Sequence, residues 1–508
     1  MRAEAALVGH SRPEVPKKPL PDGRYNNRVA SYHIESFGCR ATQADSAAIE
    51  RDLLARGISR ASGSGDASIV VLNTCTVTAA ADHDARSAIR RIHRENPTCS
   101  IVVTGCYAQR APAELAAIPG VSAVLGNSHK HEVGRIAAAR LLPRNFISLD
   151  SLNGRRPMAD GIADCHLHDR AAGPPTAGRQ PSPTIHVSDI FAHTQLTAAP
   201  LFEAGSGWER TRPNLKVQDG CDNRCSFCVI PYVRGQSRSL PLADVLREVN
   251  ALVAAGYKEV VLSGINLGRW GRDLEEFGPV PSPTRFENLI RAILENSAIE
   301  KLRLSSVEPM DWTDDLIALC AASPRIAKHA HAPLQSGSDR ILRRMHRKYR
   351  PWHYADRIRK LRNAMPDAAI GADVMVGFPG ESAADFEESR SFIAELPFTY
   401  LHVFTFSARP GTPAAVLPNH VHGGVAGERN RVLRDLAAEK NRRFRESFVG
   451  HTLNAVTLAH YKGNADSTEA LTDNYVKLRL RGVHAPNQWL PVRIESITPE
   501  GLLGSAAQ

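Results

Sequence analysis

Strand-like and helix-like segments alternate over residues 30–145. The segments SYHIESFGC, ASIVVLNTC and SIVVTGCYAQ predict three strands. Between them, DSAAIERDLLARG predicts a helix that ends at Gly57, and DARSAIRRIHREN predicts a basic helix that ends near Pro97. This order is typical of a parallel α/β sheet, so we expect a Rossmann-like domain here.

A second alternation runs from residue 211 to about residue 420. Between its first two strands lies an amphipathic helix that ends at Gly256 and has apolar residues at helical spacing: Leu242, Val245, Leu246, Val249, Leu252 and Val253. The predicted strands are NLKVQDG, EVVLSGIN, KLRLSSVEP, HAHAPLQ, AIGADVMVGFP and YLHVFTFS. Six βα units predict an open, partial (β/α)6 barrel within a domain at 211–446, with its functional groups at the carboxyl ends of the strands.

The remaining segments have other patterns. Residues 447–508 contain HTLNAVTLAHY, ALTDNYVKLRLR and WLPVRIESITPEGLLG, which predict a small antiparallel β-domain. Residues 146–210 include DRAAGPPTAGRQPSPT, which lacks periodicity and predicts a linker or insertion. Residues 1–29 are polar and rich in proline after a short apolar patch, so we expect a disordered tail and not a signal peptide. No apolar run reaches the ~18 residues of a membrane span, and we expect a cytoplasmic protein.

Composition narrows the chemistry. The formal net charge is +10 and the isoelectric point is near 9.2, which permits an anionic partner. Nine cysteines are an odd number in a chain without secretion signals, so metal or redox chemistry is favoured over a disulfide framework.

Three of the cysteines follow the predicted N-terminal strands. Cys39, Cys75 and Cys106 each come at the end of one strand. Parallel strands have their carboxyl ends at the same edge of a sheet, where α/β domains bind ligands. We therefore expect the three thiols to gather there. Cys99 precedes its strand and is expected at the opposite edge.

Three more cysteines lie within eight residues. GCDNRCSFCVIPYVRGQSRS contains Cys221, Cys225 and Cys228 directly after the first barrel strand, at the mouth of the barrel. A structural zinc site takes four ligands, and an Fe–S cluster is usually held by four thiolates. Three thiolates would leave one iron open. A zinc knuckle with a remote ligand and plain core cysteines are the alternatives.

The C-x3-C-x2-C spacing, with Phe227 before the last cysteine, resembles the signature of the radical S-adenosylmethionine (SAM) superfamily. The resemblance implies a [4Fe–4S] cluster whose fourth iron is chelated by SAM. It also implies that an electron from the cluster cleaves SAM to a radical that abstracts hydrogen from carbon.

Further segments resemble the methylthiotransferases within that superfamily. They are FGCRATQADS, VLNTCTVTAAADHDARSAIRR, VVTGCYAQRAPAEL, HAPLQSGSDRILRRMHRKYRP and ADVMVGFPGES, and the C-terminal part resembles the RNA-binding TRAM domain. The resemblance implies that Cys39, Cys75 and Cys106 hold a second [4Fe–4S] cluster. It also implies an electron donor such as flavodoxin or ferredoxin.

Shorter cues concern the substrate. NTCTVT, TGCYAQ and IPYVRGQSRS resemble the branch that acts on N6-threonylcarbamoyladenosine at position 37, in the anticodon loop of tRNA. The branches acting on isopentenyladenosine-37 and on an aspartate of ribosomal protein S12 remain alternatives. A non-catalytic Fe–S or zinc RNA-binding protein is the alternative outside enzymes.

Residues at strand ends are candidates for binding SAM. By the resemblance, the backbone at Phe227 contacts the adenine, Gly264 and Asn266 meet the amino group, and Glu308 holds the ribose. Loop packing and helix capping explain the same residue types equally well. His331, within HAPLQSGS, is either a core histidine or a catalyst.

The segment 340–362 contains ten Lys or Arg residues and one acid. Tyr349, Trp352 and Tyr354 are interleaved with them. Phosphate contacts combined with stacking aromatics suit a folded RNA, whereas a solvated helix face is the plainer interpretation. We expect RNA to contact Arg343, Arg344, Arg347, Lys348 and Arg350.

Overall fold

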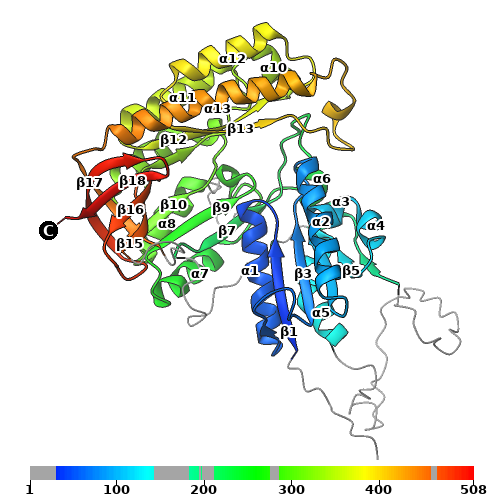
Figure 1. The fold of residues 1–508 in the computed structure, drawn as a ribbon. Coiled ribbons are helices and arrows are strands. Elements are labelled where there is room, and N and C mark those ends of the chain that lie inside the picture. The colour runs from blue at the N-terminus through cyan, green and yellow to red at the C-terminus, as the bar shows by residue number, and fades with distance from the viewer. Residues whose placement is uncertain are drawn as a thin grey trace, which may run out of the picture.

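The computed structural model describes residues 30–141, 182–193, 196, 211–274, 285–458 and 466–507. An N-terminal α/β part packs against one side of a central barrel, and a small C-terminal β-barrel lies beside the central strands (Figure 1). The predicted tail at 1–29, Cys165 and most of 146–210 lie outside the described residues. No helix in the described ranges combines the length and apolarity needed to cross a membrane.

The N-terminal sheet is parallel throughout, in the order β2-β1-β3-β4-β5-β6. Its strands are β1 (Ser31–Ser36), β2 (Ser59–Arg60), β3 (Ile69–Thr74), β4 (Ser100–Gly105), β5 (Val121–Leu125) and β6 (Thr184–His186). Its helices are α1 (Arg40–Ala55), α2 (Ala79–Glu95), α3 (Cys106–Arg110), α4 (Pro112–Ala116) and α5 (Val133–Leu141), with a 3-10 turn η1 (Asn127–Glu132) before α5. The range predicted as a linker contributes β6 and the 3-10 turn η3 (Ile190–Ala192).

Both faces of this sheet are covered, which explains why β3 is apolar along its length. Val70 and Leu72 pack on one side with Ile89 and Ile92 of α2. Ile69 and Val71 pack on the other side with helices α1 and α5. The predicted Rossmann-like architecture is confirmed.

The central part is the predicted partial barrel, and all six predicted strands are present. Strands β8-β7-β9-β10 and β11-β12-β13 form two sheets, which single bridges such as Ser306 to His331 connect. The strands are β7 (Asn214–Asp219), β8 (Arg238–Ser239), β9 (Glu259–Gly264), β10 (Lys301–Leu304), β11 (His329–His331), β12 (Ala369–Val376) and β13 (Tyr400–Thr405). The helices are α6 (Ile230–Arg234), α7 (Leu242–Ala254), α8 (Phe286–Asn296), α9 (Asp314–Ala322), α10 (Asp339–Arg344), α11 (Pro351–Ala364), α12 (Ala383–Glu395) and α13 (Gly423–Glu446). The two-residue β8, antiparallel to β7, was not predicted.

Side chains alternate between the two faces of these strands. Leu215 and Val217 of β7 belong to the apolar core shared with the outer helices, while the alternate residues Lys216 and Gln218 point to the other side. The same alternation recurs in β10 and β11, where Leu302 and Ala330 lie in that core. The inner face of the barrel is therefore polar.

The C-terminal part closes on itself as a five-stranded barrel, β14-β15-β16-β18-β17. Its strands are β14 (Thr452–Thr457), β15 (Ser467–Thr472), β16 (Lys477–Arg481), β17 (Trp489–Thr498) and β18 (Gly501–Ala506). All pairs are antiparallel, as predicted, except β16 with β18. The turn between β15 and β16 docks on the central barrel, where Arg303 donates to the carbonyls of Asp473 (3.1 Å) and Thr472 (3.4 Å).

Candidate active site

The first cysteine trio lies at one edge of the N-terminal sheet, as predicted. Cys39 caps α1, Cys75 follows β3 and Cys106 begins α3. The three elements follow the adjacent strands β1, β3 and β4, whereas Cys99 precedes β4 at the other edge. A Cβ atom at Gly38, whose φ is +118°, would lie 3.1 Å from the Cys75 sulfur, so glycine is needed for the loop to approach.

The second trio lies in the loop after β7. The side-chain amide of Asn266 donates to the Cys221 sulfur (3.6 Å), and the Arg347 guanidinium donates to the Cys225 sulfur (3.3 Å). In the first trio, the amide of Asn127 donates to Cys106 at 3.5 Å. Donors directed at sulfur atoms suit thiolates that ligate metal.

Burial makes these thiols hard to ionise without a compensating cation. It raises the pKa of Cys75 and Cys228 to about 12 and that of Cys221 to about 11, and neighbouring cysteines add to each shift. The iron of a cluster supplies such compensation, because a coordinating thiol loses its proton. Both trios therefore fit an Fe–S cluster with one iron left open.

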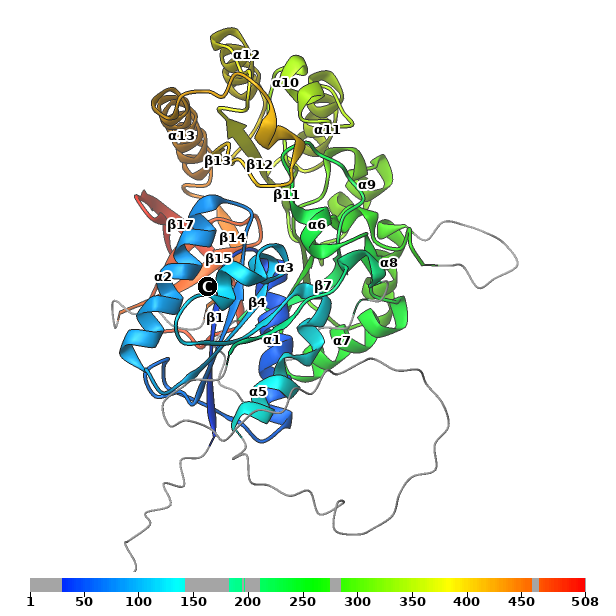
Figure 2. The same cartoon turned by 90° about the vertical axis from the view of Figure 1, so that its right-hand side faces the viewer.

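Helix α6 connects the two trios. It begins two residues after Cys228, and its flank at Val229 and Val233 packs directly against Cys106. Asn127 donates to the Val233 carbonyl at 2.7 Å as well as to the Cys106 sulfur. Both views of the molecule show α6 beside α3 (Figure 2).

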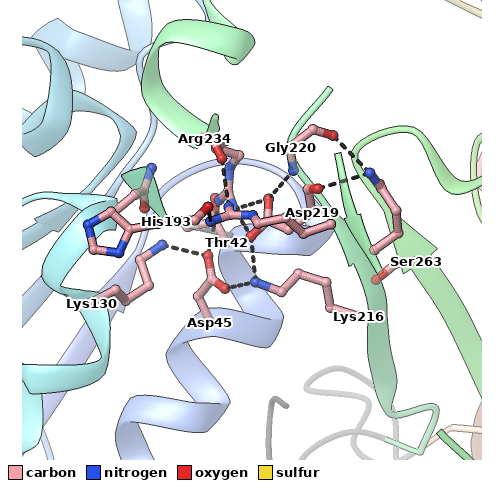
Figure 3. A network of polar contacts seen from close by, with 12 residues as sticks. Thr42, Asp45, Lys130, His193, Lys216, Asp219, Gly220, Arg234 and Ser263 are labelled. Carbon is pink, nitrogen blue, oxygen red and sulfur yellow. Dashed lines mark hydrogen bonds and ion pairs between the residues drawn. The ribbon is translucent and has the colours of Figure 1, made fainter. Parts of the chain in front are cut away.

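A buried ionic network fixes this arrangement (Figure 3). Asp45 of α1 pairs with Lys130 (2.6 Å), with Lys216 of β7 and with Arg234 of α6 (3.0 Å). Asp219 pairs with Lys216 (2.8 Å) and with Arg234 (2.9 Å). The network joins the N-terminal part to the barrel next to both trios.

Electrostatic attraction outweighs burial in this network. Burial alone would raise the pKa of Asp45, but the three neighbouring cations hold it well below its usual range. Three cations face two carboxylates, which leaves one positive charge. Arg234 keeps its proton despite burial, since Asp219, Cys106, Asp45 and Cys39 all raise its pKa. The net positive charge of the network therefore complements the negative charge of a thiolate-ligated cluster.

The predicted SAM-binding residues lie around the second trio. Glu308 lines a pocket of about 330 Å³ with Cys225, and Asn266 lines an adjoining pocket of about 390 Å³. The Asn266 side-chain oxygen is buried without a partner among the described residues. Gly264 ends β9 near this pocket, and the Phe227 side chain packs against the apolar cluster that contains Met345.

The structure corrects the RNA-binding prediction for Arg347. This side chain is only 7% exposed, and it pairs with Glu308 beside Cys225 instead of facing solvent. Tyr349 and Tyr354 are buried in the barrel core and cannot stack on bases. Arg347 therefore belongs to the pocket at the second trio.

Much of the local positive charge is balanced by acids outside the segment. Arg343 and Arg350 pair with Asp339, and Arg340 pairs with Asp385. Arg344 is half-buried beside Gly380. Lys348 and Trp352 are exposed, as is Arg343 despite its partner. Only part of the predicted surface is accessible to RNA.

On the polar inner face of β11–β13, the sequence singled out His331 but not its neighbours Asp373 and His402. His331, Asp373 and His402 have ligand atoms within 4.8 Å of one another. His331 also shares a hydrogen bond with Ser306 (2.9 Å). In the sequence, the histidines of HAHA and the aspartate of GADV alternate with small apolar residues. That alternation is also the pattern of an ordinary half-buried strand, so it does not by itself indicate a site.

Known proteins share both the sequence pattern and the fold. Residues 31–126 match uncharacterized protein family UPF0004, and residues 215–393 match the radical SAM superfamily. Threonylcarbamoyladenosine tRNA methylthiotransferase MtaB of Bacillus subtilis is 33% identical over 89% of this chain and 91% of its own length. The chain belongs to the radical-SAM methylthiotransferase family. It is therefore an enzyme of the kind that uses SAM and [4Fe–4S] clusters.

Other branches and solved structures are also similar. The tRNA-2-methylthio-N(6)-dimethylallyladenosine synthase of Sphingopyxis alaskensis is 33% identical over 83% of this chain and 85% of its own length. The radical SAM methyltransferase TsrM of Kitasatospora setae shares the fold, with a TM-score of 0.52, 15% identity and coverage of 76% of this chain and 77% of that chain. Family members with different nucleosides in their names are thus equally identical to this chain.

Proposed function

We propose that this enzyme adds a methylthio group to C2 of N6-threonylcarbamoyladenosine at position 37 of tRNA. The observation that carries this proposal is the link through α6, which begins next to Cys228 and packs against Cys106. A reaction that joins a sulfur atom to an unactivated carbon needs a sulfur-handling site beside a radical-generating site. The names of MtaB relatives, such as the one from Bacillus subtilis, support this nucleoside.

In this proposal Cys221, Cys225 and Cys228 hold the cluster that binds SAM. The other trio, Cys39, Cys75 and Cys106, holds the auxiliary cluster. When bound, the clusters supply one open iron each and the electron that cleaves SAM. Asn266 and Arg347 orient the sulfur atoms of Cys221 and Cys225, which belong to the SAM-binding cluster. The Phe227 backbone, Gly264 and Glu308 surround SAM.

Partners follow from the same proposal. Reductive cleavage of SAM requires an external electron, and a donor such as flavodoxin or ferredoxin would supply it. The exposed residues Arg343, Lys348 and Trp352 are suited to phosphate and base contacts with the anticodon loop. We place the reaction in the cytoplasm, where tRNA is available.

Nucleoside mass spectrometry tests the substrate. We expect tRNA from a strain without the gene to lose 2-methylthio-N6-threonylcarbamoyladenosine and to accumulate the form without the methylthio group. Loss of the methylthio-isopentenyl nucleoside instead would refute the proposed substrate. Unchanged tRNA with a loss of methylthio-aspartate from ribosomal protein S12 would point to the protein-modifying branch.

Iron analysis tests the two sites. Anaerobic reconstitution is expected to give about eight irons per chain, because each [4Fe–4S] cluster has four. Cys225→Ala and Cys106→Ala should each retain about half of that iron, and only Cys225→Ala should abolish SAM cleavage. Cys320→Ala is the control, because Cys320 is buried in the core away from both trios. Four irons in the unmodified enzyme would contradict the two-cluster assignment.

A further inference from the structure

One end of the polar barrel lumen is lined by aromatic and imidazole rings. His329 begins β11 and Tyr400 begins β13, and the His329 Nε2 and the Tyr400 hydroxyl share a hydrogen bond of 2.7 Å. His402 lies on the same face of β13, two residues further on. Gly371 of β12 makes room for this arrangement, because a Cβ atom there would overlap the Tyr400 ring. This end of the lumen therefore presents hydrogen-bonding rings.

The C-terminal barrel contributes a residue to this end of the lumen. Tyr475 lies in the turn between β15 and β16 with a φ of +67°, a conformation that is uncommon for tyrosine. Its ring centroid lies 4.4 Å from that of His329 and 6.0 Å from that of Tyr400. The Arg303 guanidinium stacks over the ring at 5.4 Å. The turn holds the phenol against the inner face of the barrel.

The residue that follows Cys39 contributes a cation to the same end of the lumen. Arg40 directly follows Cys39, and its carbonyl accepts a hydrogen bond from Asn214 at the start of β7 (2.7 Å). Its Nη2 donates to the Tyr475 hydroxyl at 3.2 Å. Its Nη1 is buried and has no hydrogen-bond partner within the ranges that the structure describes.

The other arginines of the lumen have a carboxylate partner. Arg303 and Arg212 both pair with the buried carboxylate of Glu259. Arg40 is partly exposed and has no ion pair with any carboxylate in the described part of the chain, but its Nη1 is buried. A buried donor atom without a partner is costly unless a ligand satisfies it. Arg40 therefore has the properties of an anion receptor.

We propose that Arg40, assisted by Tyr475, binds the carboxylate of the threonyl group on the target nucleoside. This inference rests on the proposed function. The threonylcarbamoyl group ends in a carboxylate, which is ionised at neutral pH, whereas a dimethylallyl group is uncharged and apolar. A carboxylate accepts charge-assisted hydrogen bonds from arginine and from a phenol.

The position of Arg40 next to Cys39 fits the chemistry of adenine. C2 and the N6 substituent lie on the same edge of the base, on either side of N1. A receptor for the tail one residue away from the auxiliary trio would thus direct C2 towards that trio. Arg40 would also select against the dimethylallyl nucleoside, because an apolar tail leaves the guanidinium unpaired.

The experiment compares two tRNA substrates with the reconstituted full-length enzyme. One carries the free threonyl carboxylate, and the other carries the same group converted to its primary amide. We expect the unmodified enzyme to prefer the acid by about 10- to 100-fold in kcat/KM, the range of a hydrogen bond to a charged group. Arg40→Gln should lower this preference to near unity, mainly through KM. Tyr475→Phe should lower it by several-fold.

Controls separate this inference from the proposed function. Arg56→Gln changes an exposed arginine at the other end of α1 and should leave the preference intact. Iron content and SAM cleavage without tRNA should be normal in Arg40→Gln, which shows that the variant folds. If the unmodified enzyme does not modify the acid-bearing tRNA, the proposed function fails and this inference with it. If it does, and Arg40→Gln still prefers the acid, only this inference is overturned.

Discussion

Replacing Asp45 by asparagine should loosen the contact between the N-terminal part and the barrel. Asp45 is 3% exposed and is the only member of the described ionic network that contacts all three of its cations (Figure 3). Asparagine has nearly the same shape, so the substitution removes the charge without creating a cavity. Asp219 would then be the one carboxylate left in the network, and it contacts Lys216 and Arg234 but not Lys130.

The expected loss is about 3–5 kcal/mol of unfolding free energy, the usual cost of leaving a buried charge without its partner. Asp52→Asn is a matched control on the same helix. Asp52 pairs with Arg56 at 2.9 Å, but both side chains are more than a third exposed, and such pairs contribute about 0–1 kcal/mol. Denaturant unfolding of the reconstituted enzyme under anaerobic conditions measures both losses.

The pH dependence gives a second readout. The pKa of Asp45 lies below its usual range in the folded protein, so its contribution is complete above pH ~4 and is lost only as the pH falls through the lower folded value. The difference between Asp45→Asn and the unmodified enzyme should thus be constant from pH 5 to pH 8. A loss below ~1 kcal/mol, equal to that of Asp52→Asn, would refute the role given to the network.

Three further changes probe the lumen and the pocket. Arg347→Met removes a charged donor to the Cys225 sulfur. If the second trio holds the proposed cluster, the substitution should make its reduction potential more negative by roughly 60 mV or more in a spectroelectrochemical titration, whereas Arg343→Met should not change it. Burial lowers the pKa of His329, so below pH ~6.5 the folded state binds fewer protons than the unfolded state, and the free energy of unfolding falls as the pH falls. His329→Gln removes this titration and should reduce the pH dependence of the unfolding free energy by about 1.4 kcal/mol per pH unit between pH 5 and pH 6. Gly371→Ala should displace the Tyr400 ring, lower stability by about 1–3 kcal/mol and reduce product formation, and unchanged turnover would show that the ring position is unimportant.

The sequence was sufficient to predict that Cys39, Cys75 and Cys106 lie at one edge of the N-terminal sheet, because the parallel order of the strands determines their position. Each of Cys39, Cys75 and Cys106 follows a strand, and any parallel arrangement of adjacent strands places their carboxyl ends at one edge. The exclusion of Cys99 followed from the same rule. Local spacing was sufficient for the second trio, since its three cysteines lie in one loop.

The basic segment 340–362 shows where sequence reasoning failed. A count of charges within the segment omits the acids that lie elsewhere in the chain, and Asp339, Asp385 and Glu308 take up four of its arginines. Burial cannot be read from charge, so Arg347 was placed on the surface although it is buried and contacts Cys225.

The sequence by itself determined the order of strands and helices, the two cysteine trios and the family. Those features depend on periodicity and on short-range spacing, which a linear chain records directly. Only the tertiary structure decided which charges are paired and which residues meet in the lumen. Arg40 and Tyr475 are separated by more than 400 residues, and no local pattern brings their side chains together. The packing of the N-terminal part and the C-terminal barrel around the central barrel does.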